Sequence, residues 1–394
     1  MSSGRVLVLA DDLTSAAEVG GMLARRGEPA LVTTRPDAPI VSAAAERVCI
    51  TTASRAMSAE DARGTLDRCV KTVSGKPGLV FKTMDSSLRG NWAAELDATM
   101  RGLGRHTALV APAFPAENRI TQGGIQYADG VPVDLGPAGF DPCTPVSISR
   151  VSEHLRAAGL HATELRRPTL DNGEALRNWL AARAYAPELA AVIVDAEDAA
   201  DLELIVRSGA PERLVWCGSP GLAAALLADA PLAPPPVSAA ALAVVGSLHP
   251  VSRGQVEHAH AHGIPVIEIA ADASPSATAL AVEGRLRTAR RAILCTPMST
   301  LMDAPDAHAA AVVREVVLRT EDLALVLTGG DTASAVLAGL DADVLHVVGQ
   351  WAPGIPVGRL DGVRTLPLAT KAGGFGRPDT LVSLLTQLTR GASS

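Results

Sequence analysis

Residues 323–336 read Leu-Ala-Leu-Val-Leu-Thr-Gly-Gly-Asp-Thr-Ala-Ser-Ala-Val. The first five residues are all apolar, which predicts a strand buried on both faces. Gly329 and Gly330 allow a tight turn, and Asp331 or Thr332 can cap the helix that follows. A strand, a glycine turn and a helix N-terminus together present free backbone N–H groups, which suit a phosphate. Taken alone, the stretch could equally be a βα turn that only packs.

Two further glycine-bearing turns follow predicted strands in the same half of the chain, at Gly246-Ser247 and at residues 370–376. Three such turns at one sheet edge predict a site for phosphates and a nucleotide, with Lys371 adding a point charge. The carboxylate of Asp331 stands where a phosphate-bound Mg²⁺ could use it. The chain has no Gly-x-Gly-x-x-Gly opening a helix and no P-loop motif, which disfavours a standard dinucleotide fold and a P-loop kinase.

The composition is that of a globular protein without a bias towards nucleic acids. The chain has 394 residues, of which 47% are hydrophobic and 20% charged, and its formal net charge is −7. This charge and an aromatic content of only 3% disfavour nucleic-acid binding and stacking platforms for bases. The five cysteines never form Cys-x-x-Cys, which favours free thiols. We expect no signal peptide, no membrane span and a cytoplasmic location.

The length of the chain predicts two domains. Prolines cluster near residue 234, and we interpret residues 231–240 as a stiff linker, because such a stretch suits neither a helix nor a central strand. Strands and helices alternate on both sides of it. The predicted fold class is therefore α/β, with domains at 1–230 and 241–394, each holding a mostly parallel sheet flanked by helices, and a ligand cleft between them.

Two aspartates follow the first predicted strand, residues 5–10. Asp11 and Asp12 would lie at the C-terminal edge of a parallel strand, where open α/β sheets bind ligands. Adjacent carboxylates repel each other, so keeping both there requires hydroxyls, a cation or backbone N–H groups. We favour a ligand role for at least one of them. The alternative is that one merely caps the next helix, for which Ser15 and Glu18 also offer a capping box.

A dense polar cluster follows another predicted strand, in the sequence Lys-Thr-Met-Asp-Ser-Ser-Leu-Arg-Gly-Asn at residues 82–91. A lysine, an aspartate, two serines and an arginine together suit a small polyhydroxylated anion. Arg89 could hold a carboxylate through two hydrogen bonds, while Asp85 and the serines bind hydroxyls. The alternative is a solvated loop with a local Asp–Arg pair. Asn91 can cap the helix that follows.

Three histidines at positions 258, 260 and 262 resemble a metal-binding run. Only His258 and His262 would share a face of a helix. They lie near a helix end marked by Gly263, where a protonated imidazole is favoured by the helix dipole. We therefore interpret them as solvated side chains and not as metal ligands.

Several motifs taken together resemble the four-carbon acid sugar kinases. They are, in chain order, Ala10-Asp-Asp-Leu-Thr14, Lys82-x-x-Asp85-Ser-Ser-Leu-Arg-Gly-Asn91, Pro112-Ala-Phe-Pro115 with Arg119-x-Thr121, Gly246-Ser247, Gly329-Gly-Asp-Thr332, Pro353-Gly-Ile-Pro356 and Lys371-Ala-Gly-Gly-Phe-Gly376. The resemblance implies an N-terminal sugar-acid-binding domain and a C-terminal nucleotide-binding domain. It also implies that ATP phosphorylates the terminal hydroxyl of a threonate- or erythronate-like acid.

Carried over motif by motif, the resemblance implies two sets of contacts. The nucleotide contacts would be Ser247, Gly329, Gly330, Asp331, Thr332 and Gly373. The substrate contacts would be Asp11, Asp12, Arg55, Lys82, Asp85 and Arg89. We expect MgATP as the donor, with Asp331 near Mg²⁺, and Asp12 or failing that Asp85 as the base for the attacking hydroxyl. The three cationic residues of the second set would hold the substrate carboxylate.

Four positions depart from the pattern of that family. Ser15 stands where glycine is usual, Thr51 where aspartate is expected, Ser87 where threonine is commoner, and Gln350 where glutamate is usual. Because carboxylates are lost at positions 51 and 350, the exact substrate and the arrangement of the metal stay open.

Two other functions are compatible with the sequence. An aldolase or epimerase acting on a phosphorylated sugar acid would use the same phosphate cradle, and needs a metal set or a Schiff-base lysine such as Lys82 or Lys371. A non-catalytic sugar-acid-binding protein is the second alternative, for which Thr51 and Gln350 are the only indications. The expected partners are a small sugar acid and ATP, without nucleic acid or membrane, and the sequence allows a homodimer.

Overall fold

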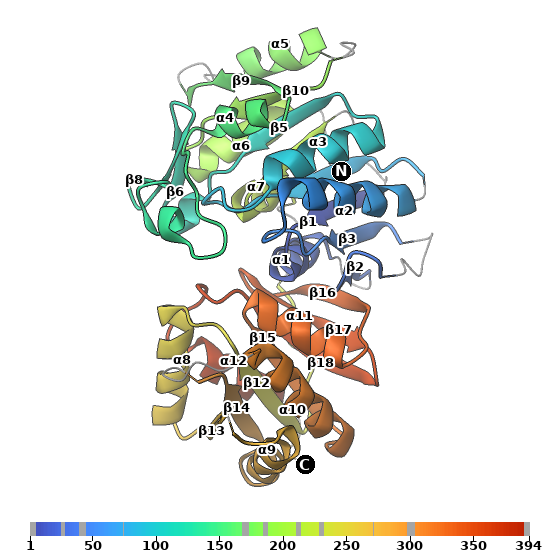
Figure 1. Cartoon of the computed structure of the whole chain (residues 1–394), viewed down its shortest axis with the longest axis vertical. Coiled ribbons are helices and arrows are strands. Elements are labelled where there is room, and N and C mark those ends of the chain that lie inside the picture. Colours follow the sequence, from blue (N-terminus) through green and yellow to red (C-terminus); the bar gives the residue numbers. More distant parts are fainter. Residues whose placement is uncertain are drawn as a thin grey trace. The chain divides into compact units, whose positions relative to one another are not determined.

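The computed structural model describes residues 5–24, 28–38, 45–73, 75–167, 173–183, 188–209, 214–227, 232–270, 272–297 and 304–389. They form two compact α/β units, in agreement with the predicted fold class (Figure 1). Unit 1 comprises residues 1–22 and 40–229, and unit 2 comprises residues 23–39 and 230–394. Unit 2 thus includes a segment near the N-terminus that the expected boundary at residue 230 places in the first domain.

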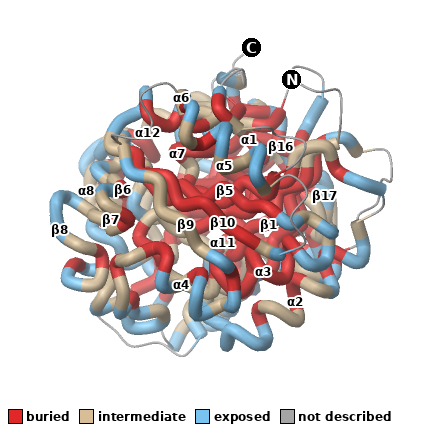
Figure 2. Tube along the Cα trace, turned by 90° about the horizontal axis from the view of Figure 1, so that it is seen from above, coloured by how far each residue is buried: buried red, intermediate tan, exposed pale blue. Residues whose placement is uncertain are grey.

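Unit 1 is built on a parallel sheet. Its strand order is β3 (Arg47–Thr51), β1 (Val6–Ala10), β4 (Leu79–Thr83), β11 (Val215–Gly218), β5 (Thr107–Ala111), β10 (Ala190–Val194) and β9 (His161–Leu165). Every residue of β5 and β10 is buried, and Figure 2 shows these strands within the buried part of the chain. Burial on both faces explains why these strands are almost continuously apolar in sequence.

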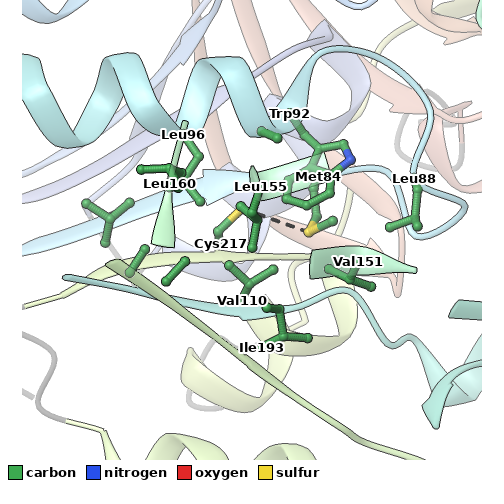
Figure 3. Close-up of a cluster of buried hydrophobic side chains, with 14 of the residues drawn as sticks. Met84, Leu88, Trp92, Leu96, Val110, Val151, Leu155, Leu160, Ile193 and Cys217 are labelled. Atoms are coloured by element: carbon green, nitrogen blue, oxygen red, sulfur yellow. Dashed lines mark hydrogen bonds between the residues drawn. The ribbon is translucent and has the colours of Figure 1, made fainter. Parts of the chain in front are cut away.

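Seven helices with described bounds flank this sheet. They are α1 (Leu13–Leu23), α2 (Ala59–Thr72), α3 (Trp92–Leu103), α4 (Val151–Ala157), α5 (Glu174–Arg183), α6 (Ala199–Ser208) and α7 (Pro220–Leu226). Figure 3 shows the core beneath α3, where Trp92 and Leu96 pack with Met84 and Cys217. Asn91 precedes α3 but does not cap it through its side chain. Its amide instead donates to the carbonyl oxygens of two residues in the loop between β3 and α2, Ser54 (3.1 Å) and Met57 (2.8 Å).

A small antiparallel sheet of β6 (Arg119–Gln122), β7 (Ile125–Ala128) and β8 (Val131–Pro132) extends from unit 1. The turn between β7 and β8 has positive φ at Asp129 and Gly130, as an Asp-Gly hairpin requires. Gln126 joins this sheet to the polar loop after β4, because its Nε2 donates to the carbonyl oxygen of Ser86 at 2.7 Å.

Unit 2 contains a mixed sheet of order β13 (Val266–Glu268), β14 (Arg291–Cys295), β12 (Ala240–Val245), β15 (Leu323–Thr328), β18 (Thr365–Lys371), β17 (Ile355–Asp361), β16 (Val344–Ala352) and β2 (Ala30–Thr33). The pairs from β13 to β18 are parallel, and those from β18 to β2 are antiparallel. The unit's helices are α8 (Pro250–Ala261), α9 (Pro275–Ala289), α10 (Pro305–Arg319), α11 (Gly330–Gly339) and α12 (Thr380–Thr389).

The proline-rich segment belongs to unit 2 and contacts β16 where the structure describes it; residue 231 lies outside the described residues. Leu232 forms a parallel bridge with Gln350, and the backbone N–H of Ala233 donates to the Gln350 carbonyl oxygen at 2.8 Å. Among the helices that the structure describes, none combines the length and the apolar composition needed to cross a bilayer.

Candidate functional site

Asp11 and Asp12 follow β1 directly and share one arginine. The Nε of Arg55 lies 2.7 Å from Asp11 Oδ2, and its Nη1 lies 2.5 Å from Asp12 Oδ2. Arg55 fits here because Gly90 leaves space: a Cβ at that glycine would be 3.2 Å from Arg55 Cγ. The arginine thus offsets the repulsion between two adjacent carboxylates.

The two carboxyl groups differ in their environment. Burial raises the pKa of Asp11, which is 2% exposed, although Arg55 and Lys82 oppose this effect. Burial also acts to raise the pKa of Asp12, but Arg55 and hydrogen bonds from Ser15 and Thr14 outweigh it, and the net shift is downward. Asp12 is therefore ionised at neutral pH, and at 19% exposure its side chain reaches solvent.

Asp12 also begins α1. Its Oδ1 accepts hydrogen bonds from the Ser15 backbone N–H (2.6 Å) and the Thr14 hydroxyl (2.9 Å). The predicted capping box of Ser15 and Glu18 is therefore wrong, because the helix starts at Leu13 and Ser15 lies inside its first turn. The cap uses one oxygen of Asp12 and leaves the other on Arg55. The alternative that one of the two aspartates caps this helix is therefore confirmed, and a ligand role stays a prediction.

Glu18 is a buried carboxyl group whose sequence position had suggested only a helix-capping role. Burial raises the pKa of Glu18 to about 8, and the nearby charges of Asp12 and Glu117 act in the same direction. A neutral carboxyl group therefore lies in α1, close to the ionised Asp12.

In the loop after β4, Asp85 and Arg89 form a bidentate pair. Arg89 Nε lies 2.9 Å from Asp85 Oδ2, and its Nη2 lies 3.0 Å from Oδ1. Arg89 Nη1 lies 3.1 Å from Asp141 Oδ2, on the segment after the small sheet. Burial opposes ionisation of Asp85, but the hydrogen bonds and charge of Arg89 lower the pKa of Asp85 well below its usual value. The local Asp–Arg pair considered from the sequence is present, with a second carboxylate added.

Lys82 points into the core of unit 1. Its Nζ lies 2.7 Å from Glu95 Oε2 and donates to the Thr83 carbonyl oxygen at 2.7 Å. The other oxygen of Glu95 accepts a hydrogen bond from the Ser54 hydroxyl. Burial opposes the charge of Lys82, but Glu95 and Asp11 raise the pKa of this lysine. Glu95 was missed from the sequence, although a glutamate on the apolar face of a helix is a signal of such pairing.

The three glycine-bearing turns of unit 2 converge. Gly329 has φ of 102° and precedes α11, so the helix is not capped by Asp331 or Thr332 as predicted. A Cβ on Gly329 would lie 3.4 Å from Ser247, and a Cβ on Gly373 would lie 2.1 Å from Ser247 Oγ. The sequence-predicted residues Ser247, Gly329 and Gly373 are therefore neighbours. Each of the three turns contains a glycine, which has no side chain to cover its backbone.

Asp306 was not identified from the sequence, yet it lies at these turns. Its Oδ1 accepts a hydrogen bond from the Thr332 hydroxyl at 2.6 Å, and it would lie 2.9 Å from a Cβ on Gly246. Thr332 is buried, whereas Asp331 is exposed in the first turn of α11. In the described residues, no group of three or more His, Cys, Asp or Glu side chains could hold a metal by itself.

Lys371 ends β18 beneath the third turn. Its Nζ donates to the carbonyl oxygens of Ala372 and Phe375, each at 3.0 Å, and burial lowers the pKa of Lys371 to about 8. Its hydrogen bonds thus hold the turn that contains Gly373.

The His258 and His262 rings are stacked with their centroids 4.1 Å apart, at the end of α8.

The fold and these residues define a two-unit α/β protein with a cluster of aspartates and arginines in one unit and three converging glycine-bearing turns in the other. A family model described as a sugar-binding N-terminal domain matches residues 6–226, and one described as a nucleotide-binding C-terminal domain matches residues 242–381. The chain belongs to the four-carbon acid sugar kinase family.

Named relatives cover almost the whole chain. The D-threonate kinase of Bordetella bronchiseptica is 33% identical over 95% of each chain. The D-erythronate kinase of Heliobacterium modesticaldum is 29% identical over 97% of each chain. A crystal structure of a Salmonella typhimurium LT2 protein has the same fold, with a TM-score of 0.80 and 20% identity over 98% of this chain and 99% of that one.

Proposed function

We propose that this chain is an ATP-dependent kinase that phosphorylates the terminal hydroxyl of a four-carbon sugar acid such as threonate or erythronate. The observation that carries the proposal is the pairing, within one chain, of the Gly329–Ser247–Gly373 cradle with the Asp11–Arg55–Asp12 cluster. Relatives named as D-threonate and D-erythronate kinases over nearly the full length support it.

In this proposal the phosphates of ATP lie against the backbone of the converging turns, with contacts from Ser247, Gly329, Gly330, Thr332 and Gly373. The N-terminus of α11 contributes its free N–H groups and the positive end of its dipole. Asp306 acts as a positioning residue, because it fixes the hydroxyl of Thr332.

The donor set at these turns fits Mg²⁺, which is bound through one or two carboxylates together with substrate phosphates and water. Asp331 would hold the ion, since its carboxylate is exposed in the first turn of α11. The ion would neutralise charge on the transferring phosphoryl group. Asp306, whose carboxylate accepts from the adjacent Thr332 hydroxyl, would offer a further oxygen at the turns.

In unit 1 the sugar acid would contact Asp11, Asp12, Arg55, Asp85 and Arg89. Lys82 is fully buried against Glu95, so we assign it a positioning role through its charge on Asp11. Asp12 is proposed as the base that orients and deprotonates the attacking hydroxyl. We prefer it to Asp85, because Arg55 contacts Asp12 through one oxygen only, whereas Arg89 binds both oxygens of Asp85. Phosphoryl transfer depends more on positioning than on a strong base, so a lowered pKa is compatible with this role.

The test is an ADP-release assay with threonate, erythronate, 3-oxo-tetronate and glycerate. We expect ADP release that requires one of the four-carbon acids, and a product with phosphate on the terminal oxygen. ATP-independent cleavage or epimerisation of a phosphorylated acid would support the aldolase or epimerase alternative, and tight acid binding without ADP release would support a binding protein. The buried, hydrogen-bonded state of Lys82 disfavours a Schiff base at that residue.

We propose a cytoplasmic location, where ATP is available, and a homodimer as the working assembly. Light scattering of the purified chain measures the assembly directly, and a monomer at micromolar concentration would contradict it.

A further inference from the structure

The arginines assigned above to the substrate are already bound to carboxylates. Arg55 contacts Asp11 and Asp12, and Arg89 contacts Asp85 and Asp141. Each cluster therefore holds two carboxylates against one guanidinium. A substrate carboxylate that approached either arginine would meet more negative than positive charge, and would have to displace an existing hydrogen bond.

Arg119 differs from both. Its Nη1 donates to the carbonyl oxygen of Glu117 at 3.0 Å, and its Nε donates to the Ser87 hydroxyl at 3.3 Å, so both of these hydrogen bonds go to uncharged groups. Within the described residues, its one ion pair is with the Glu117 carboxylate at 3.9 Å, too long for a hydrogen bond. The side chain is 31% exposed. Its charge is thus less compensated than that of Arg55 or Arg89.

The position of Arg119 is fixed relative to the polar loop after β4. It begins β6, and its backbone exchanges two hydrogen bonds with Phe114, of 2.8 and 3.1 Å. On the neighbouring strand, Gln126 holds the Ser86 carbonyl oxygen and accepts from Thr121 at 2.7 Å. The residue that Arg119 touches, Ser87, donates its backbone N–H to Asp85 Oδ2 at 3.1 Å. Arg119 therefore contacts the same loop that holds the Asp85–Arg89 pair, one residue removed from Asp85.

We propose that Arg119 binds the carboxylate of the sugar acid, and that the two Asp–Arg–Asp clusters accept hydrogen bonds from its hydroxyls. The assignment rests on the proposed function and gives it a basis for selecting acids over polyols. It follows the chemistry of the groups: a carboxylate only accepts hydrogen bonds and needs an uncompensated donor, whereas hydroxyls need acceptors, which the aspartates supply.

The test compares the sugar acid that the wild type turns over with its neutral carboxamide, which keeps every hydroxyl but lacks the charge. For Arg119→Gln we expect the KM for the acid to rise at least tenfold, with the KM for the amide and for ATP within about twofold of wild type. Calorimetric binding of the acid without ATP should weaken by the same factor. Arg101→Gln is the matched control, because Arg101 is an exposed arginine of α3 whose partner Asp97 also pairs with Arg63.

Arg89→Gln separates this assignment from a clamp at Arg89. We expect it to weaken the acid and the amide alike, since it frees Asp85 and Asp141 from their partner. The assignment is overturned if Arg119→Gln changes acid and amide equally, or if Arg89→Gln alone affects the acid selectively. A rise in the KM for the acid, but not for the amide, in Arg119→Gln supports the assignment.

Arg119→Lys covers the case in which the glutamine variant does not fold. It keeps the charge but not the planar fork, so the preference for acid over amide should fall by a few-fold; an unchanged preference would count against the assignment. If the wild type releases no ADP with any acid and binds none, the proposed function fails, and this assignment with it. If the wild type turns over the acid and Arg119→Gln leaves the KM for the acid unaltered, only the assignment of Arg119 is overturned and the proposed function stands.

Discussion

The carboxylate of Asp12 combines two tasks at the scale of one residue. One oxygen receives the N–H and hydroxyl groups that begin α1, and the other faces Arg55. The helix cap therefore orients a side chain that we propose as the catalytic base. A residue whose orientation is fixed by its own helix needs little reorganisation before the reaction.

Asp12→Asn should reduce kcat at least about 100-fold, because the amide cannot take up a proton. Asparagine is as good a cap as aspartate, so the melting temperature should stay within a few degrees of wild type. Steady-state kinetics and thermal unfolding measure the two effects. Asp129→Asn, with the same change of charge at an exposed turn, is the control. Turnover of Asp12→Asn within a few-fold of wild type would exclude Asp12 as the base.

Gly373→Ala tests the converging turns with a single methyl group. The new Cβ would lie 2.1 Å from Ser247 Oγ, so one of the two turns must move. We expect the KM for ATP to rise at least tenfold, while binding of the sugar acid is unchanged. Gly254→Ala in α8 is the control, since a Cβ there meets nothing within 4 Å and alanine favours the helix. Equal ATP affinity in both variants would argue against this site.

At the scale of elements, the sequence predicted the strand, turn and helix of residues 323–336 correctly because their signals are local. Every residue of β15 is buried, as its apolar run indicates, and Gly329 occupies a backbone region that favours glycine. The caps predicted for α3 and α11 were wrong, whereas α1 is capped by Asp12, which was the alternative to its predicted capping box. Asp, Ser, Thr and Asn can all serve as caps, and which one does so depends on contacts elsewhere, as the hydrogen bonds of Asn91 to the loop between β3 and α2 illustrate.

Helix α1 carries a pH-dependent contribution to stability through Glu18. Its folded-state pKa of about 8 lies above the ordinary value of 4.5, so the folded protein binds the proton more tightly than the unfolded chain. The resulting stability is fully present below about pH 4.5 and is lost as the pH rises towards 8. Melting temperatures of wild type and Glu18→Gln, measured from pH 5 to 8.5, should diverge by at least about 3 °C in favour of the variant. Parallel curves would contradict the assignment of this pH dependence to Glu18.

At the scale of the whole molecule, the two units do not divide the chain at a single point. Strand β2, from the first forty residues, pairs with β16 and completes the sheet of unit 2. The hydroxyl of Thr34 donates to the Ala342 carbonyl oxygen at 2.6 Å, and Arg35 binds Asp343 at 2.8 Å. The sheet of the nucleotide-binding unit therefore depends on a segment near the N-terminus.

Val32→Asp tests this dependence. Val32 is fully buried in β2, so an unpaired carboxylate there should cost ~3 kcal/mol or more of unfolding free energy. The stabilisation of the protein by added ATP should fall, although the substitution lies in the N-terminal part of the sequence. Val348→Asp, on the same sheet but 41% exposed, should change little. A Val32→Asp protein that loses only the stabilisation by sugar acid would refute the dependence.

The sequence by itself determined the fold class, the order of the motifs and the glycine turns, because each depends on neighbouring residues: apolar runs, positive φ and proline. The tertiary structure decided which charges meet. Arg55 reaches Asp11 across 44 positions, Thr332 reaches Asp306 across 26, and Thr34 reaches Ala342 across 308. Such pairs leave no periodic signal, since an ion pair or a hydrogen bond needs only two atoms at the right distance, and only the folded chain brings those atoms together.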